Sequence, residues 1–299
     1  MADTKDHAGT PGSGRPEPGS GRPGRVRYTA TTLLRPFVDY RRLAWLWVRA
    51  FAQYPLSLVL MSLAVTVSVL TQVGAVVILF GHAGALAGFS VMEGLLVFGL
   101  ASSAFGIADM FAGSVERLGN HIRSGTLDAM LIRPVSPLVQ VAADEFSPRR
   151  LGKVVPALAI LGVALSEVDV EWSAAKVGLP VLMVLSGTLI CAAIWVITGC
   201  LQFFVADARE AANSLTYGGQ ALTEYPIAIY GQEVVRSVTY VVPLAFISWQ
   251  PALLVLDRPD PLGMPEQLRY LGPVVAVLLC LCAALTWRFG LRHYRSTGS

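Results

Sequence analysis

The chain has 299 residues, of which 54% are hydrophobic and 14% are charged, and its mean hydropathy is +0.57. A soluble domain carries about 25% charged residues, so this composition excludes a protein with an ordinary charged shell and predicts that much of the surface faces lipid. The formal net charge of +3 is too small to indicate nucleic-acid binding.

The N-terminal residues 1–27 form a low-complexity segment, in which Pro-Gly-Ser-Gly-Arg-Pro occurs at 11–16 and again at 18–23. Such a segment has little to bury, and we predict a disordered tail. Residues 38–53 differ, because aromatic and leucine residues recur there at helical spacing and arginines fall elsewhere on the helix. This pattern predicts a helix lying in the membrane interface.

Charge-free stretches predict the membrane spans, since about 20 apolar residues cross the hydrocarbon core. No charged residue occurs between Arg49 and Glu93, and the glycines at 81–88 predict a short loop that divides this stretch into two spans. The fifth predicted span contains Pro243 and Pro251, which should kink it or break it. The six spans are predicted at about 56–80, 89–110, 150–167, 177–205, 233–256 and 270–288.

The distribution of Lys and Arg predicts the orientation of these spans. Nine basic residues precede the first span, six lie between residues 111 and 153, and Arg288, Arg292 and Arg295 close the chain. The opposite loops carry few. Both termini are therefore predicted in the cytoplasm, and the weak third span is needed to place the basic C-terminus there. The predicted fold is an all-α membrane protein with one permease domain at 28–299.

The longest cytoplasmic connection, roughly 111–150, is predicted to contain a short amphipathic helix, or two helices with a break at Gly125. Pro134 and Pro137 should end it. The spacing fits an anchor in the interface and also fits a helix that docks into a partner's groove. Periodicity alone leaves both interpretations open.

The sequence lacks the residue patterns of a metal site and of a phosphate-binding loop. The four cysteines lie in apolar stretches without metal-ligand spacing, and the four histidines are scattered among the tail and loops. The sequence contains no Gly-rich phosphate loop of the form Gly-x-x-x-x-Gly-Lys-Ser/Thr. We therefore expect no catalytic residue, no metal and no cofactor in this chain.

The loop also carries a family resemblance. The run Gly125-Thr126-Leu127-Asp128 followed by Leu131-Ile132-Arg133-Pro134-Val135-Ser136-Pro137 resembles the signature of type 2 ATP-binding-cassette (ABC) transporter permeases, in a subfamily of small six-span exporters. Further similar motifs, in the family's order, are Tyr225-Pro226, Ile229-Tyr230, Pro243-Leu244-Ala245-Phe246, Pro251-Ala252 and the terminal 294–299. The resemblance covers about residues 35–299.

The resemblance implies a permease subunit of an ATP-driven exporter in the cell membrane, with ATP and Mg bound by a separate partner. Two nucleotide-binding ATPase subunits and a second permease chain, identical or related, would complete the assembly. The helix at 38–53 would be the connecting helix, and the 111–137 loop would hold the coupling helix. Spans 1, 2 and 5 would line the pathway, with the outer end of span 5 as its gate.

On this basis two groups of site residues are predicted. The first group would couple the chain to the ATPase. Its apolar anchors would be Ile122, Leu127 and Leu131, and Gly125 would allow a bend. Asp128 and Arg133 would pair with the partner or be solvated. The second group would lie along the pathway or gate and consists of Tyr225, Tyr230, Arg236, Pro243 and Pro251. The tyrosines could instead belong to an aromatic belt at the membrane interface, and Arg236 could instead extend its side chain to the cytoplasmic surface.

Two other functions stay open at this stage. One is a membrane-embedded enzyme that acts on lipid. The scarcity of polar residues in the spans argues against it. The other is an accessory membrane subunit that transports nothing. The sequence identifies neither the substrate nor, beyond the resemblance, the direction of transport.

Overall fold

In the computed structural model, the structure describes residues 30–86, 88–205, 208–260 and 263–294. The chain divides into residues 1–35 and 36–299, and all the packing given below lies within the second unit. Within the described residues every regular element is a helix, apart from one isolated bridge between Leu86 and Phe89. The predicted tail at 1–27 lies outside the described residues.

The first two helices meet at a sharp turn. Helix α1 spans Ala30–Phe51, and α2 spans Pro55–Ala83 with Pro55 in its first turn, where the missing N–H costs no helical hydrogen bond. Most of α2 is exposed, and the side chains that it turns outward are apolar, including Leu56, Leu60, Leu63 and Val67. A helix with an apolar exposed surface is suited to lipid rather than to water.

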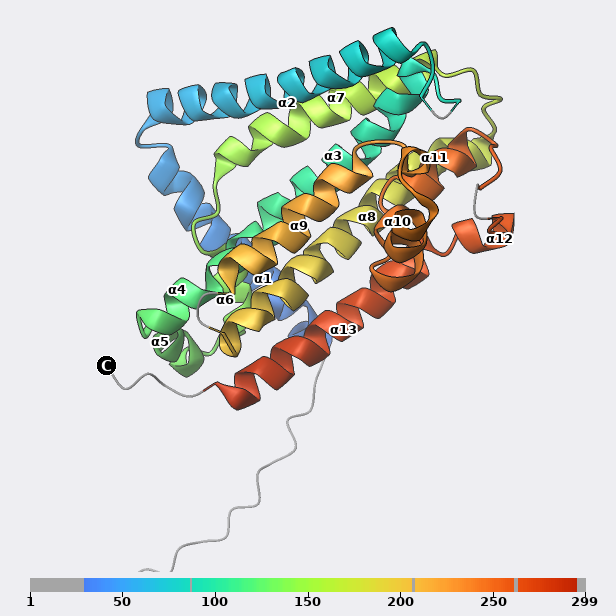
Figure 1. Cartoon of the computed structure of the whole chain (residues 1–299). Helices are drawn as coiled ribbons and strands as arrows, with labels where there is room; N and C mark the ends of the chain where they lie inside the picture. Colours follow the sequence, from blue (N-terminus) through green and yellow to red (C-terminus); the bar gives the residue numbers. More distant parts are fainter. Residues whose placement is uncertain (1–29, 87, 206–207, 261–262, 295–299) are drawn as a thin grey trace, which may run out of the picture. The chain divides into compact units, whose positions relative to one another are not determined.

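Helix α3, Val91–Ala112, is the most deeply buried of the helices that are long and apolar enough to cross a membrane. Its N-terminus carries a capping box, in which the Ser90 hydroxyl accepts from the Glu93 N–H and the Glu93 carboxylate accepts from the Ser90 N–H. The helix contacts α2, α7 and α8 (Figure 1). At Gly99 a Cβ would lie 2.9 Å from the Leu161 Cα, so glycine is what permits the close approach of α3 and α7.

Short helices connect α3 to the next long one. In chain order they are η1 (Gly113–Arg117), α4 (Leu118–Arg123), α5 (Thr126–Ile132), α6 (Pro137–Ala143) and η2 (Pro148–Arg150). Helix α7, Leu151–Glu167, then packs on α2 and α3, and the Thr66 hydroxyl donates to the Gly152 carbonyl across the α2–α7 contact at 3.0 Å.

The second half of the chain is built on α8, Ala174–Gly199, which lies between α3 and α13 (Figure 1). A 3-10 turn, η3 (Cys200–Phe203), follows it, and then α9 spans Arg209–Thr223. The sequence analysis placed no helix at 209–223. The buried residues of α9, Ala212, Thr216, Gly219 and Thr223, nevertheless recur at helical spacing and face α3 and α8.

The predicted fifth span at 233–256 is interrupted, as its prolines predict, and the interruption lies at Pro243. The segment forms η4 (Ile227–Ile229), α10 (Gln232–Arg236), the π-helical turn η5 (Ser237–Val241), η6 (Leu244–Phe246) and α11 (Trp249–Val255). The break falls at Val242, whose extended backbone is the one that a following proline imposes. Pro251 lies in the first turn of α11, where a proline leaves the helix intact.

The chain ends with α12, Glu266–Arg269, and α13, Gly272–His293, which packs along α8. The predicted spans at 56–80, 89–110, 177–205 and 270–288 correspond to α2, α3, α8 and α13, and these four have the length and apolar composition to cross a membrane. The predicted span at 150–167 corresponds to α7, which is shorter at 17 residues.

Two hydrophobic clusters hold the fold together. The larger joins α3, α8, η6 and α11, with Leu96, Phe98, Trp195 and Trp249 among its buried members. The smaller joins η1, α4 and α5 to the C-terminal parts of α8 and α13. The loop between α3 and α7 is therefore packed on the long helices rather than held away from them.

Candidate functional site

The loop that carries the family signature consists of two short helices with a bend between them. Gly125 separates α4 from α5 and has a φ of 69°, a left-handed conformation that a residue with a Cβ adopts only under strain. The Gly125 carbonyl accepts from the Asp128 N–H at 3.1 Å. Of the two predicted alternatives, one helix or two, the structure shows two helices separated at Gly125.

One face of the helix pair is packed inward. Leu127 is 0% exposed and belongs to the smaller cluster with Val115, Leu118, Val141 and Trp287. Leu127 was predicted to be an apolar anchor for the ATPase. The structure corrects this placement, because Leu127 holds α5 against the protein's own core and has no surface to offer. Ile122 is half-buried and packs against the same cluster.

The C-terminal end of α5 carries an exposed apolar edge. Ile132 is 86% exposed and Leu131 is 43% exposed, and the exposed Arg133 follows directly. Ile132 was not among the predicted site residues. Among the described residues, Ile132 is the most exposed of the large apolar side chains. We call Leu131, Ile132 and Arg133 the α5 tip.

A buried glutamine fixes the α5 tip in place. The side-chain amide of Gln140, on α6, donates to the carbonyl oxygens of Met130 and Val135, both at 2.9 Å. It thereby satisfies backbone acceptors at the C-terminus of α5. Nothing in the sequence pattern identified Gln140, because its partners are set by the tertiary turn between α5 and α6. Asp128 is half-buried on α5 and does not belong to the tip.

The predicted gate residues lie in the broken segment after α9. Tyr225 and Tyr230 are half-buried and pack against the larger cluster, and Pro251 is buried in α11. Pro243 lies at the break between η5 and η6. Arg236 is exposed and forms an ion pair with Glu233 one turn away, at 3.2 Å. The five residues therefore share a segment without converging on one point.

A polar cluster that the sequence analysis missed lies between α3, α7 and α9. The Glu224 carboxylate accepts from the Ser102 hydroxyl at 3.2 Å and from the Gln220 amide at 2.5 Å. The Lys153 ammonium donates to the Gln220 side-chain oxygen at 3.3 Å and lies 4.2 Å from the centre of the Phe105 ring. We call Ser102, Lys153, Gln220 and Glu224 the polar cluster.

The polar cluster places two ionisable side chains among apolar helices. Glu224 is 8% exposed. An acid and a base buried among apolar helices are costly unless they are paired, and Gln220 bridges the two. The one signal that could have found them is the spacing of Gln220 and Glu224, four residues apart on the continuation of the α9 face.

A second polar contact ties the loop after α11 to the α2–α3 turn. The Arg258 guanidinium donates to the Gly88 carbonyl at 2.7 Å and stacks on the Phe89 ring at 4.5 Å. Arg269, 8% exposed, donates in turn to the Arg258 carbonyl at 2.6 Å. These contacts hold the end of α11 to the start of α3.

Comparison with known families agrees with this architecture. Residues 65–298 match the ABC-2 family transporter proteins, and this match covers more than half of the chain. An all-helical fold with four helices of membrane-spanning length, and a packed signature loop after α3, is a multi-pass membrane component of a transporter. The chain belongs to the ABC-2 transporter family. No curated protein and no solved structure was found to match it.

Proposed function

We propose that this chain is the permease subunit of an ATP-driven exporter and that it couples to a separate ATPase through the α5 tip. Family membership supports the transport role. The single observation that carries the coupling role is the 86% exposed Ile132 at the end of a helix that the fully buried Leu127 fixes to the core. ATP and Mg would be bound by the partner, and this chain would perform no chemistry.

The packing of the loop gives a route for the coupling. Leu127 and Leu118 fix α4 and α5 to Val196 of α8 and Trp287 of α13, while η1 continues directly from α3. A displacement of the α5 tip by a closing ATPase would therefore move three long helices together. Rigid-body movement of packed helices is an established way to switch a membrane protein between two arrangements.

We further propose six crossings, with α2, α3, α7, α8, α9 and α13 as the spans and both termini in the cytoplasm. Here α9 takes the place of the predicted span at 233–256, and the broken segment after it would be the gate. The enrichment of basic residues before α2, in the α3–α7 loop and from the last turns of α13 to the C-terminus supports this orientation. The chain would then lie in the cell membrane beside a second permease chain, with substrate exported between them past α2, α3 and α9.

The test is co-purification of the permease with a nucleotide-binding subunit from its own cells. Ile132→Asp places a charge in the proposed interface, where burial of one isoleucine is worth about 2–3 kcal/mol. We expect the amount of bound ATPase to fall at least about thirtyfold. Ile132→Val, which keeps an apolar side chain, is the matched control and should retain the ATPase.

Two results would overturn the proposal. If Ile132→Asp combined with Leu131→Asp leaves the ATPase bound, the α5 tip is not the docking element. If the intact chain purifies with no ATPase, an accessory subunit outside any ATP-driven exporter becomes the better description. Unchanged thermal unfolding of each variant establishes that a loss of binding reflects the interface and not the fold.

A further inference from the structure

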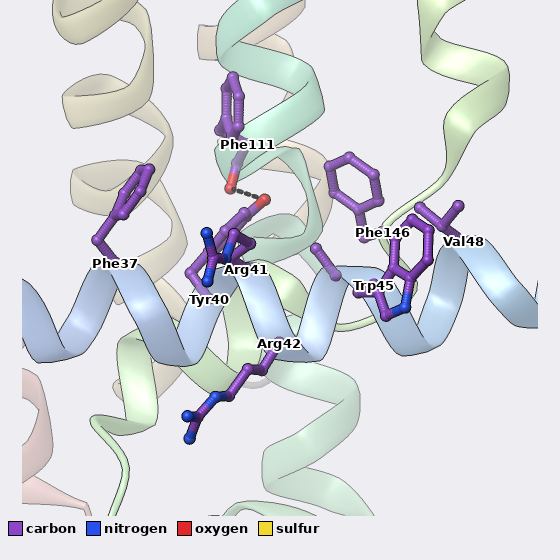
Figure 2. Close-up of a pocket in the computed structure, with 9 residues that line it drawn as sticks. Phe37, Tyr40, Arg41, Arg42, Trp45, Val48, Phe111 and Phe146 are labelled. Carbon is purple, nitrogen blue, oxygen red and sulfur yellow. Dashed lines mark hydrogen bonds between the residues drawn. The ribbon is translucent and has the colours of Figure 1, made fainter.

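Helix α1 forms one wall of a pocket of about 490 Å³ whose other walls come from the end of α3 and from the segment before η2. The pocket is lined mainly by aromatic rings: Phe37, Tyr40 and Trp45 from α1, Phe111 from α3, and Phe146. Figure 2 shows the α1 side chains around the pocket together with Phe111 and Phe146. The aromatic lining suits an apolar chain better than a polar molecule.

The walls of the pocket are fixed by Tyr40. Its hydroxyl donates to the Phe111 carbonyl at 3.1 Å, the contact drawn in Figure 2, and its ring meets the Phe146 ring edge-on at 6.3 Å between centroids. Burial raises the pKa of the Tyr40 phenol, so the hydroxyl stays a hydrogen-bond donor. Ala44, 8% exposed, leaves room at the pocket floor that a larger residue would fill.

The mouth of the pocket combines exposed aromatic rings with two arginines. Phe37 is 69% exposed and Trp45 is 60% exposed, which is unfavourable in water and typical of the headgroup level of a membrane. Arg41 and Arg42 are exposed and line the pocket, and no ion pair joins either to a carboxylate in the part of the chain that the structure describes.

We propose that this pocket binds one anionic phospholipid of the surrounding bilayer. An acyl chain would lie against the aromatic wall, and the phosphate would be held by Arg41 and Arg42. Guanidinium groups match phosphate oxygens in geometry and charge. The position fits a lipid, because α1 leads within four residues into the apolar helix α2. A peptide fits less well, because the only hydroxyl among the pocket's aromatic residues, that of Tyr40, is already bonded to Phe111.

The inference does not depend on ATPase coupling and is tested separately. The full-length protein is reconstituted in nanodiscs of phosphatidylcholine mixed with phosphatidylglycerol, transferred to detergent, and examined by native mass spectrometry for retained lipid. We expect one tightly retained phospholipid, with phosphatidylglycerol enriched over phosphatidylcholine relative to the nanodisc composition.

Three variants identify the site. Arg41→Gln with Arg42→Gln should lower the enrichment of phosphatidylglycerol about tenfold to thirtyfold, because juxtamembrane basic residues each strengthen contact with anionic lipid. Phe37→Ala, at an exposed position that does not endanger folding, should lower the retention of both lipids. Arg49→Gln is the matched control, since Arg49 is also exposed on α1 and does not line the pocket, and it should behave as the unaltered protein.

Three outcomes would overturn the proposal. Equal retention of the two lipids would remove the role of the arginines. Undiminished enrichment in the double arginine variant would place the lipid elsewhere on the protein. Retention of a peptide or of another chain in place of lipid would assign the pocket to a protein partner.

Discussion

Arg258, in the loop after α11, forms an ion pair with Glu93 in the first turn of α3, with 2.7 Å between the guanidinium nitrogen and the carboxylate oxygen. The same guanidinium contacts Gly88 and Phe89, and the same carboxylate completes the α3 capping box. One pair of side chains therefore joins the N-terminus of α3, the α2–α3 turn and the end of the broken segment.

We predict that Arg258→Ala lowers the free energy of unfolding by about 1–2 kcal/mol, because it removes a partly exposed ion pair together with a hydrogen bond and a ring contact. The measurement is thermal unfolding in detergent. Arg236→Ala is the control, since its ion pair with Glu233 is exposed and lies within one turn of helix, and it should leave stability unchanged. If both substitutions change the unfolding free energy equally, Arg258 does not stabilise the contact between α3 and the loop after α11.

Leu127 and Ile132 should respond to substitution in opposite ways. Leu127→Ala leaves a cavity in the smaller cluster and should lower the free energy of unfolding by about 2–4 kcal/mol. Ile132→Ala should change stability by less than about 0.5 kcal/mol, because the side chain is almost fully exposed, yet it should weaken binding of the ATPase. Thermal unfolding and co-purification, measured on both variants, separate the two roles.

The polar cluster should be strongly non-additive. Glu224→Leu alone leaves the Ser102 hydroxyl and the Gln220 amide without their acceptor and the Lys153 charge without a nearby carboxylate, and it should destabilise the protein by about 2–4 kcal/mol. Adding Lys153→Met to it removes the orphaned charge and should recover about half of that loss. A double-mutant cycle on unfolding free energy is the measurement. If the effects of the two substitutions on the unfolding free energy simply add, Glu224 and Lys153 do not belong to one interacting network.

Gly125 should tolerate little substitution. Gly125→Ala puts a Cβ on a residue at φ 69° and should cost about 1 kcal/mol, whereas Gly125→Asn should cost less because asparagine enters this region more readily. The readout is ATPase rate in the reconstituted complex together with thermal unfolding. If alanine and asparagine behave alike, backbone conformation is not what the glycine supplies.

Much of the helical framework can be predicted from the sequence because of one rule: a helix that crosses the hydrocarbon core needs about 20 apolar residues without charges. The charge-free stretches predicted helices that the structure places at α2, α3, α7, α8 and α13. Helix α9 escaped that rule because it begins with Arg209 and Glu210 and buries its small residues against other helices. The stretch at 233–256 satisfied the rule but contains Pro243, which breaks the helix.

Site residues were harder to predict because their roles depend on which face of a helix is packed. Leu127 and Ile132 are five positions apart, which places them about 140° from each other around a helix. The sequence pattern contains both and cannot say which one turns to the core. Glu224 is similar, since its burial depends on Ser102, which lies 122 positions away in the chain.

The length of α2 has a consequence for the membrane itself. Its 29 residues extend about 43 Å, whereas the hydrocarbon core of a bilayer is about 30 Å thick. Because its outward side chains are apolar along most of this length, α2 must tilt, or the surrounding lipid must thicken to cover it. Bilayer thickness then becomes a variable that sets the angle of this helix, so that the same chain would stand differently in membranes with short and with long acyl chains.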